Sequence, residues 1–222
     1  MENNAGPAKT CFYRHYKNKP YKFLGIVRHS ESLEELVLYE TLYKNENSQF
    51  WVRPKEMFFE MVKISDKLVH RFKPIDINFV NSHELTNSIL VDVKKISESI
   101  LTKFNQDELI DNLKNNLKPF LQVAYDEDLA VGFQAGFGID EENFFTWSTG
   151  ILPNYRSLGL GTSFMNQQYE WCKKNGFKRI TKSLTNEFPE VLSFNLKSGF
   201  EIIGTRKIAN EPLALLFERK IT

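Results

Sequence analysis

Hydrophobic residues recur at helical spacing along the stretch that follows residue 80. Apolar positions three or four residues apart form one face of a helix, and here they are Leu85, Ile89, Val93, Ile96 and Ile100. A second helix is predicted over 106–117, because Asn105 can act as its N-cap with Glu108 three residues further on. Two more helices are predicted over 162–174 and 189–197.

Short apolar runs between these helices predict strands. The runs cover residues 75–80, 120–125, 130–137, 144–152, 179–184, 200–207 and 213–220. From about residue 76 the predicted order is therefore β-α-α-β-β-β-α-β-α-β-β, which indicates an α/β (α+β) domain over 76–222.

The N-terminal part has a different pattern. Residues 12–64 hold eleven aromatic side chains, and strand-like runs at 21–29 and 35–43 are separated by short polar turns. This pattern predicts a small, aromatic-filled, all-β barrel-like domain over 12–64. Residues 65–75 contain few apolar side chains and are expected to form a linker, and residues 1–11 a flexible tail.

Composition excludes several classes of function. The chain has 222 residues, with 29 Lys and Arg against 28 Asp and Glu, and its net charge of +1 argues against nucleic acid as a partner. Two cysteines, Cys11 and Cys172, are too few for a disulfide framework or a four-ligand zinc site, so no metal is expected. No apolar run reaches the roughly 20 residues that span a bilayer. We therefore expect no membrane association and a cytoplasmic location.

A glycine-containing loop lies between a predicted strand and a predicted helix. Residues 151–162 read Ile-Leu-Pro-Asn-Tyr-Arg-Ser-Leu-Gly-Leu-Gly-Thr. Backbone N–H groups at a helix N-terminus bind anions such as phosphate, and glycine lets the ligand approach the backbone closely. A third glycine and an acidic residue about 20 positions further on, which a dinucleotide site requires, are missing. The Gly-Lys-Ser/Thr of a P-loop is missing as well.

The motif Ile151-x-Pro153-x-x-Arg156-x-x-Gly159-x-Gly161 resembles the pyrophosphate loop of the GNAT superfamily of acyl-CoA N-acyltransferases. Further along, Asn186 and the motif Asn195-x-x-x-Gly199-Phe200 resemble a second motif of that family. The resemblance covers about 76–222 and implies the GNAT fold, with a mixed central sheet. In that fold, the strand that ends at Ile151 and the strand that begins at Arg179 should splay apart.

The resemblance also implies how the chain would be used. Acetyl-CoA, a co-substrate, would lie between the two splayed strands. Its pantetheine would form hydrogen bonds with the backbone near Ile151, and its pyrophosphate would contact the loop. A backbone N–H near Ile151 would also donate a hydrogen bond to the oxyanion of the reaction. The implied cofactor-binding residues are Ile151, Arg156, Ser157, Leu158, Gly159, Leu160, Gly161, Thr162, Asn186 and Asn195.

The implied reaction is direct attack of a primary amine on the thioester. It requires a deprotonated amine, a donor for the oxyanion and a stabilised thiolate. Many family members place a tyrosine, the general acid to the thiolate, where this chain has Asn195. The predicted strand 144–151 carries no carboxylate, which leaves Glu187, Glu190 or a water held by Thr149 as the base. The candidate catalytic residues are therefore Asn195, Thr149 and Glu187.

Two alternatives remain open at this point. The fold could hold acyl-CoA without turnover, since the tyrosine and the strand carboxylate are both missing. Alternatively, the N-terminal domain could be a recognition module that brings the transferase to a macromolecular target. Residues 12–64 resemble a small bacterial family of unassigned function, through segments 13–17, 25–31, 34–39 and 51–58. The acceptor is expected to be a small-molecule or peptide amine, and the sequence leaves the oligomeric state open.

Overall fold

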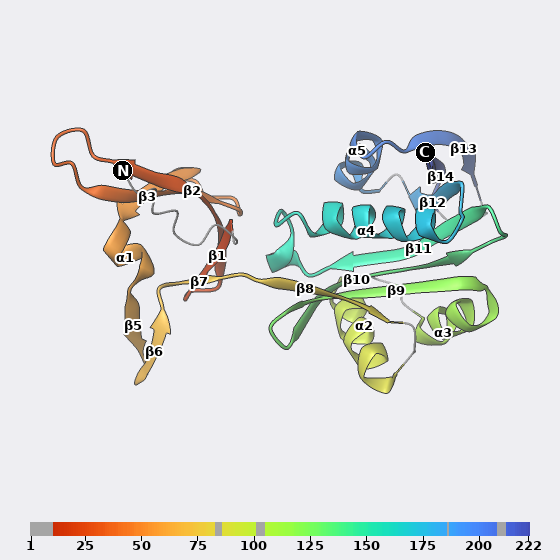
Figure 1. The fold of residues 1–222 in the computed structure, drawn as a ribbon, viewed down its shortest axis with the longest axis horizontal. Coiled ribbons are helices and arrows are strands. Elements are labelled where there is room, and N and C mark those ends of the chain that lie inside the picture. Colours follow the sequence, from red (N-terminus) through yellow and green to blue (C-terminus); the bar gives the residue numbers. More distant parts are fainter. Residues whose placement is uncertain (1–10, 83–85, 101–104, 186, 208–211) are drawn as a thin grey trace. The chain divides into compact units, whose positions relative to one another are not determined.

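The computed structural model describes residues 11–82, 86–100, 105–185, 187–207 and 212–222. The chain divides into two compact units, Met1–Asn78 and Phe79–Thr222, and each is described by itself (Figure 1). In the described part of the chain, no helix is long and apolar enough to cross a membrane.

The N-terminal unit is built around a five-stranded antiparallel sheet with the order β4-β3-β2-β1-β7. Its elements are β1 (Phe12–His15), β2 (Lys19–Arg28), β3 (Glu35–Thr41), β4 (Phe50–Pro54), α1 (Lys55–Phe59), β5 (Met61–Ile64), β6 (Lys67–His70) and β7 (Phe72–Pro74). Strands β5 and β6 form a separate hairpin.

Residues 65–75 were expected to be a linker, and here the structure differs from the prediction. They contain β6 and β7, and β7 pairs with β1 through Tyr13–Pro74 and His15–Phe72. Phe72 is only 3% exposed. A short polar stretch thus becomes an edge strand because one aromatic side chain enters the core and strand β1 supplies the hydrogen bonds.

Aromatic rings fill this unit. Phe58 and Phe72 stack with ring centroids 4.1 Å apart, and Tyr39 packs against both rings. The sheet is strongly curved. Strands β4 and β7 stand at its opposite ends, and yet the Arg53 guanidinium of β4 lies 5.8 Å from the centroid of the Phe72 ring in β7. The predicted small, aromatic-filled all-β region is confirmed.

The C-terminal unit has a seven-stranded mixed sheet with the order β13-β14-β12-β11-β10-β9-β8. Its elements are β8 (Ile77–Ser82), α2 (Asn87–Ile100), α3 (Gln106–Asn115), β9 (Leu117–Asp126), β10 (Leu129–Gly138), β11 (Asn143–Ile151), η1 (Pro153–Tyr155), α4 (Leu160–Lys174), β12 (Arg179–Thr185), α5 (Pro189–Lys197), β13 (Glu201–Arg206) and β14 (Ala214–Lys220). Apart from the short η1 turn, this is the predicted order. The Asn105 cap is confirmed, since its side chain accepts from the N–H groups of Asp107 and Glu108.

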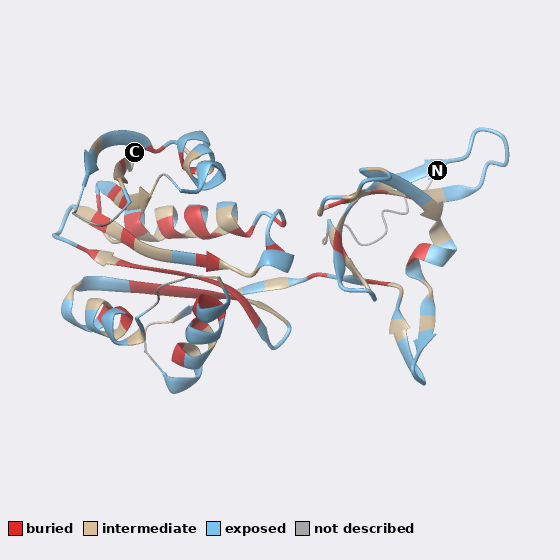
Figure 2. Cartoon of the chain, turned by 180° about the vertical axis from the view of Figure 1, so that it is seen from behind, coloured by how far each residue is buried: buried red, intermediate tan, exposed pale blue. Residues whose placement is uncertain are grey.

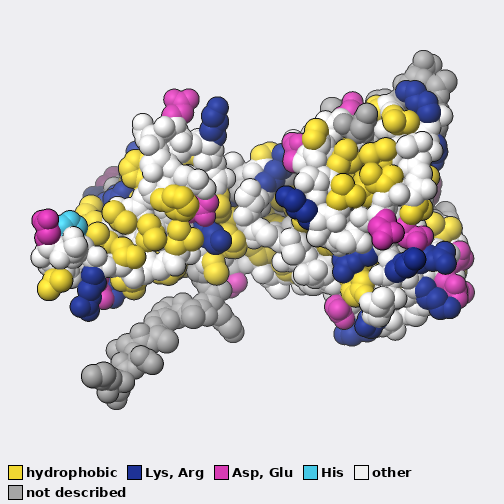
Figure 3. Space-filling view, turned by 90° about the horizontal axis from the view of Figure 1, so that it is seen from above, with side chains coloured by type: hydrophobic (Ala, Val, Ile, Leu, Met, Phe, Trp, Pro, Cys, Tyr) yellow, Lys and Arg dark blue, Asp and Glu magenta, His cyan; other side chains and the backbone are white. Residues whose placement is uncertain are grey.

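Helices cover both faces of this sheet, and the two faces have separate apolar cores (Figures 1 and 2). Helices α2 and α3 pack on one face, around Val93, Leu109 and Phe133. Helix α4 covers the other face, where Met165 and Cys172 pack with sheet residues such as Phe144, and α5 adds side chains to the same core. Apolar side chains also reach the surface of each unit (Figure 3).

Candidate functional site

Strands β11 and β12 are parallel neighbours that separate after a short paired segment. Pairing joins only Asn143–Phe145 of β11 to Arg179–Thr181 of β12. Beyond it β11 continues to Ile151 and β12 to Thr185, with no further pairing between them in this described stretch. The splay that the family resemblance implies is therefore present, and it leaves the backbone edges of two strands facing each other without a partner strand.

The loop that follows β11 is held by buried side chains and by side-chain hydrogen bonds. Leu158 and Leu160 are 5% and 3% exposed, so both anchor the loop in the core. The buried Tyr155 hydroxyl donates to the Asp126 carboxylate at 2.7 Å, which ties the η1 turn to the end of β9. Ser157 has a left-handed backbone with φ of 63° and turns the chain towards α4.

The N-terminus of α4 is open and carries no negative side chain. Gly159 is its N-cap with φ of 78°, no side chain caps this end within the described loop, and the first turn contains no acidic residue. The first helical N–H groups have no carbonyl partner inside a helix, and Ser163 is the first to donate to a loop carbonyl, that of Gly159 at 3.0 Å. A Cβ at Gly159 would meet no atom within 4 Å. This geometry fits an external phosphate group.

Two other predicted loop residues are exposed. Arg156 folds back on the strand end, where its Nε donates to the Ile151 carbonyl at 3.3 Å. Thr162 lies in the first turn of α4 with its side chain in solvent. Both lie on the same short segment as the open helix end. Asn186, also predicted to bind the cofactor, falls outside the described residues.

Asn195 is buried on α5, at 3% exposure. Its Nδ2 donates to the Val191 carbonyl at 2.8 Å, one turn back in the same helix, whereas its Oδ1 has no partner in the described structure. The carboxamide thus keeps an unused acceptor, Oδ1, and the second N–H of Nδ2 for any further group. Its backbone carbonyl accepts from the N–H of Phe200 at 3.1 Å, which holds the start of β13 against the helix end.

The structure does not bring the other two catalytic candidates together. Thr149 is exposed on β11 and pairs with Gln134 of β10. Glu187 is exposed just ahead of α5, and in the described part of the chain no hydrogen bond or ion pair links it to Thr149 or Asn195.

Between Thr146 and Ser148 the register of β11 shifts by one residue, which is a β-bulge at Trp147.

Sequence reasoning missed a row of buried amides under α4. Gln122 and Gln134 lie side by side on β9 and β10, and Gln134 in turn pairs with Thr149. Gln122 and Gln134 are at most 2% exposed, and the Oε1 of each has no partner within the described residues. The sequence signal is a single glutamine inside each of two separate apolar runs.

Sequence reasoning also missed Lys182, which is 7% exposed on β12. It shares a strand face with the apolar residues Ile180 and Leu184, and its burial depends on residues near the end of the chain. The alternation predicts the face, but no local signal shows that the lysine on that face is buried.

Comparison with known proteins agrees with this geometry. Residues 87–196 match the sequence profile described as "Acetyltransferase (GNAT) family", and residues 11–74 match that of "Protein of unknown function (DUF1653)". A curated relative, N-alpha-acetyltransferase 50 from Danio rerio, is 32% identical over 90 residues, covering 39% of this chain and 54% of the relative. The chain therefore spans about half the length of the relative it matches.

Solved structures share the fold at low sequence identity. The ribosomal-protein-S18-alanine N-acetyltransferase from Escherichia coli superposes with a TM-score of 0.57 and 12% identity, covering 65% of this chain and 95% of that one. Arabidopsis thaliana Naa50, in complex with the bisubstrate analogue CoA-Ac-MVNAL, gives a TM-score of 0.56 and 17% identity, covering 65% of this chain and 99% of that one.

The splayed strands and the glycine-capped helix define an acyltransferase fold of the GNAT type. Residues 87–196 match the model of the GNAT acetyltransferase family, and they follow a match to the DUF1653 family.

Proposed function

We propose that the C-terminal unit is an acetyl-CoA-dependent N-acetyltransferase in which a primary amine attacks the thioester directly. One observation carries the proposal: the strand that separates from its neighbour is the strand that leads into an open helix N-terminus. A ligand with an extended amide-containing arm and a pyrophosphate can use both features at once, pairing with the free strand edges and with the helix amides.

Each part of the chain has a distinct task in this proposal. The N–H groups of Leu158 to Thr162 receive the pyrophosphate, and Arg156 adds a positive charge beside them. A backbone N–H near Ile151 stabilises the oxygen that becomes negative as the amine adds. The acceptor amine loses its proton to a water held by Thr149 or to Glu187.

We further propose that the acceptor is the N-terminal amine of a peptide. The match to N-alpha-acetyltransferase 50 supports this acceptor class. The bisubstrate analogue bound to the Arabidopsis protein, whose name joins CoA, Ac and MVNAL, points the same way.

A second candidate function is acyl-CoA binding without turnover. Asn195 favours it, because a carboxamide can hydrogen-bond a thiolate but cannot supply a proton to it. On this alternative the protein binds acetyl-CoA and releases no thiol.

The test has two stages on the full chain. Calorimetric titration with acetyl-CoA, with NADH as the control ligand, should give selective binding, with a dissociation constant near micromolar. Free thiol is then followed with a panel of peptides that differ in their first residue, and with free amines. Thiol release that depends on one peptide class supports the proposal. Binding without release on the whole panel favours the second candidate, and no binding contradicts both.

A further inference from the structure

Lys182 stands where the two central strands begin to separate. It follows Thr181, the last residue of β12 that pairs with β11. Side chains alternate along a strand, so Lys182 shares a sheet face with Ile180, which packs in the core under α4 together with Phe200. The lysine therefore projects from the start of the gap onto the face that α4 and α5 cover.

The ammonium group of Lys182 has an apolar environment. Its Nζ lies 4.2 Å from the centroid of the Phe200 ring, and its side chain is 7% exposed. Among the described residues, no carboxylate forms an ion pair with the Lys182 ammonium group. The backbone N–H of Phe200 also donates to the backbone carbonyl of Asn195. Lys182 of β12 and Asn195 of α5 therefore both contact Phe200.

Charged and titratable groups around this lysine come from two packed elements. Arg219 of β14 pairs with Ile180 and so faces the same side, where its guanidinium lies 4.2 Å from the ring of Tyr169 in α4. Cys172 of α4 belongs to the same buried core. Glu218 pairs with Thr181 and lies on the opposite face. The surroundings are thus apolar or positive.

Burial first, and then the charge of Arg219, lower the pKa of Lys182 from 10.5 to about 7. Near neutral pH both the charged and the neutral form of such an amine are populated. A thiol has a pKa of about 8.5, so transfer of a proton from this ammonium to a thiolate is downhill.

We propose that Lys182 is the proton donor to the sulfur of the departing CoA thiolate, filling the role for which Asn195 is unsuited. This proposal rests on the proposed transferase function. As the amine nitrogen bonds to the carbonyl carbon, the carbon–sulfur bond breaks and its electron pair goes to sulfur. Lys182 gives a proton to that sulfur and becomes neutral, the new amide nitrogen loses its extra proton to water, and Lys182 regains a proton from solvent.

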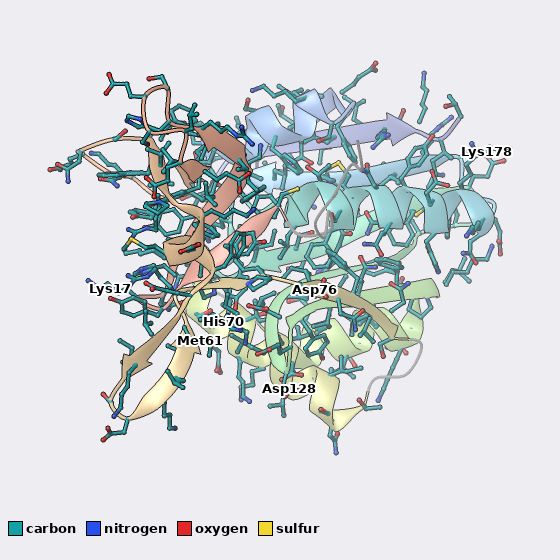
Figure 4. All side chains as sticks on the ribbon, turned by 60° about the vertical axis from the view of Figure 1, so that its left-hand side comes forward. Lys17, Met61, His70, Asp76, Asp128 and Lys178 are labelled. Atoms are coloured by element: carbon teal, nitrogen blue, oxygen red, sulfur yellow. The ribbon has the colours of Figure 1, made fainter. Side chains whose placement is uncertain are left out.

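The experiment compares four full-length proteins: wild type, Lys182→Met, Lys182→Arg and the control Lys178→Met. Lys178 projects from the connection between α4 and β12 (Figure 4), 66% exposed, with Glu142 as its ion-pair partner. Acetyl-CoA affinity comes from calorimetry, and single-turnover thiol release is followed from pH 6 to 9.5 with the best peptide acceptor. Failure of wild type to bind or to turn over contradicts the proposed function and is seen before any variant is compared.

A proton donor predicts a specific pattern. Lys182→Met should bind acetyl-CoA within about threefold of wild type and release thiol on the order of 100-fold more slowly, a typical contribution of general acid catalysis. Its rate should also lack the fall that wild type shows as pH rises above about 7. Lys182→Arg should stay slow, because a guanidinium does not give up its proton. Lys178→Met should match wild type.

Other results overturn the proposal. Full rescue by arginine would mean that only positive charge is needed. Acetylation of Lys182 itself, seen as a stoichiometric mass increase located to this residue, would make it an acceptor. Titration of the Lys182 side chain in the wild-type protein by NMR gives an answer even if a variant fails to fold, and a pKa near 10 would exclude the role.

Discussion

A methyl group placed at Gly161 would lie 3.3 Å from the ring of Phe194. The first turn of α4 and the helix α5 therefore meet closely, and a methyl group at this position would require the Phe194 ring to move by a few tenths of an ångström. The Cδ1 of Ile151 would be 3.8 Å from the same methyl group, so the contact also includes the end of β11. The second glycine of the loop motif thus sets the spacing of two helices beside the strand gap, whereas the first, Gly159, faces open space.

Substitution of Gly161 by valine should push α5 away from α4. We expect a loss of about 1–3 kcal/mol in the free energy of unfolding, typical of overpacking, together with at least tenfold weaker acetyl-CoA binding. Asn166→Val is the matched control, because it adds a branched side chain at an exposed position of the same helix. Urea unfolding and calorimetry measure the two effects. Equal affinity in Gly161→Val and the control would show that the helix spacing does not matter for binding.

Charge at the helix end can be tested separately from shape. Gly159 has a left-handed backbone, and a Cβ placed there would meet no atom within 4 Å. Asparagine and aspartate both tolerate that conformation better than most residues. Gly159→Asn should keep most of the acetyl-CoA affinity. Gly159→Asp, nearly identical in size, should weaken it at least tenfold, because a carboxylate repels the pyrophosphate. Calorimetry at low and high salt should show the difference shrinking with salt, and equal binding by the two variants would contradict the loop assignment.

Much of the C-terminal unit could be predicted because its signals are local. Helix spacing, the Asn105 cap and the strand-loop-helix order all depend on neighbours in sequence, and the structure reproduces them. The residues that were missed depend on distant contacts. Phe72 becomes part of an edge strand only because β1 lies beside it, and Lys182 is buried only because Phe200 and β14 fold over it. Strand alternation places Lys182 on the face of Ile180, but only these distant contacts decide that the lysine is buried.

Burial of Lys182 should also make stability depend on pH. Its pKa is about 7 in the folded chain, against the ordinary lysine value of 10.5 that the unfolded chain retains, so between these values the unfolded state binds the extra proton. The free energy of unfolding should therefore rise with pH from about 7 to 10, with a slope of about 1.4 kcal/mol per pH unit at most from this group. Lys182→Met should remove that slope and be more stable than wild type at pH 7. Urea unfolding at four pH values measures it, and parallel curves for the two proteins would contradict the prediction.

The N-terminal unit should lose stability in mild acid because of His15. This ring packs against Phe72 at 4.8 Å, and burial, followed by the charges of Arg53, Arg71 and Lys17, lowers its pKa from 6.5 to about 4. Between pH 6.5 and 4 the unfolded chain takes up a proton that the folded unit resists, so stability falls across that window and levels off below it. Calorimetric unfolding should show one transition moving to lower temperature as pH falls through this range. His15→Phe keeps an aromatic ring and should make that transition independent of pH there, whereas His29→Phe, at an exposed position, should retain the wild-type dependence. A wild-type response in His15→Phe would assign the acid sensitivity to other groups.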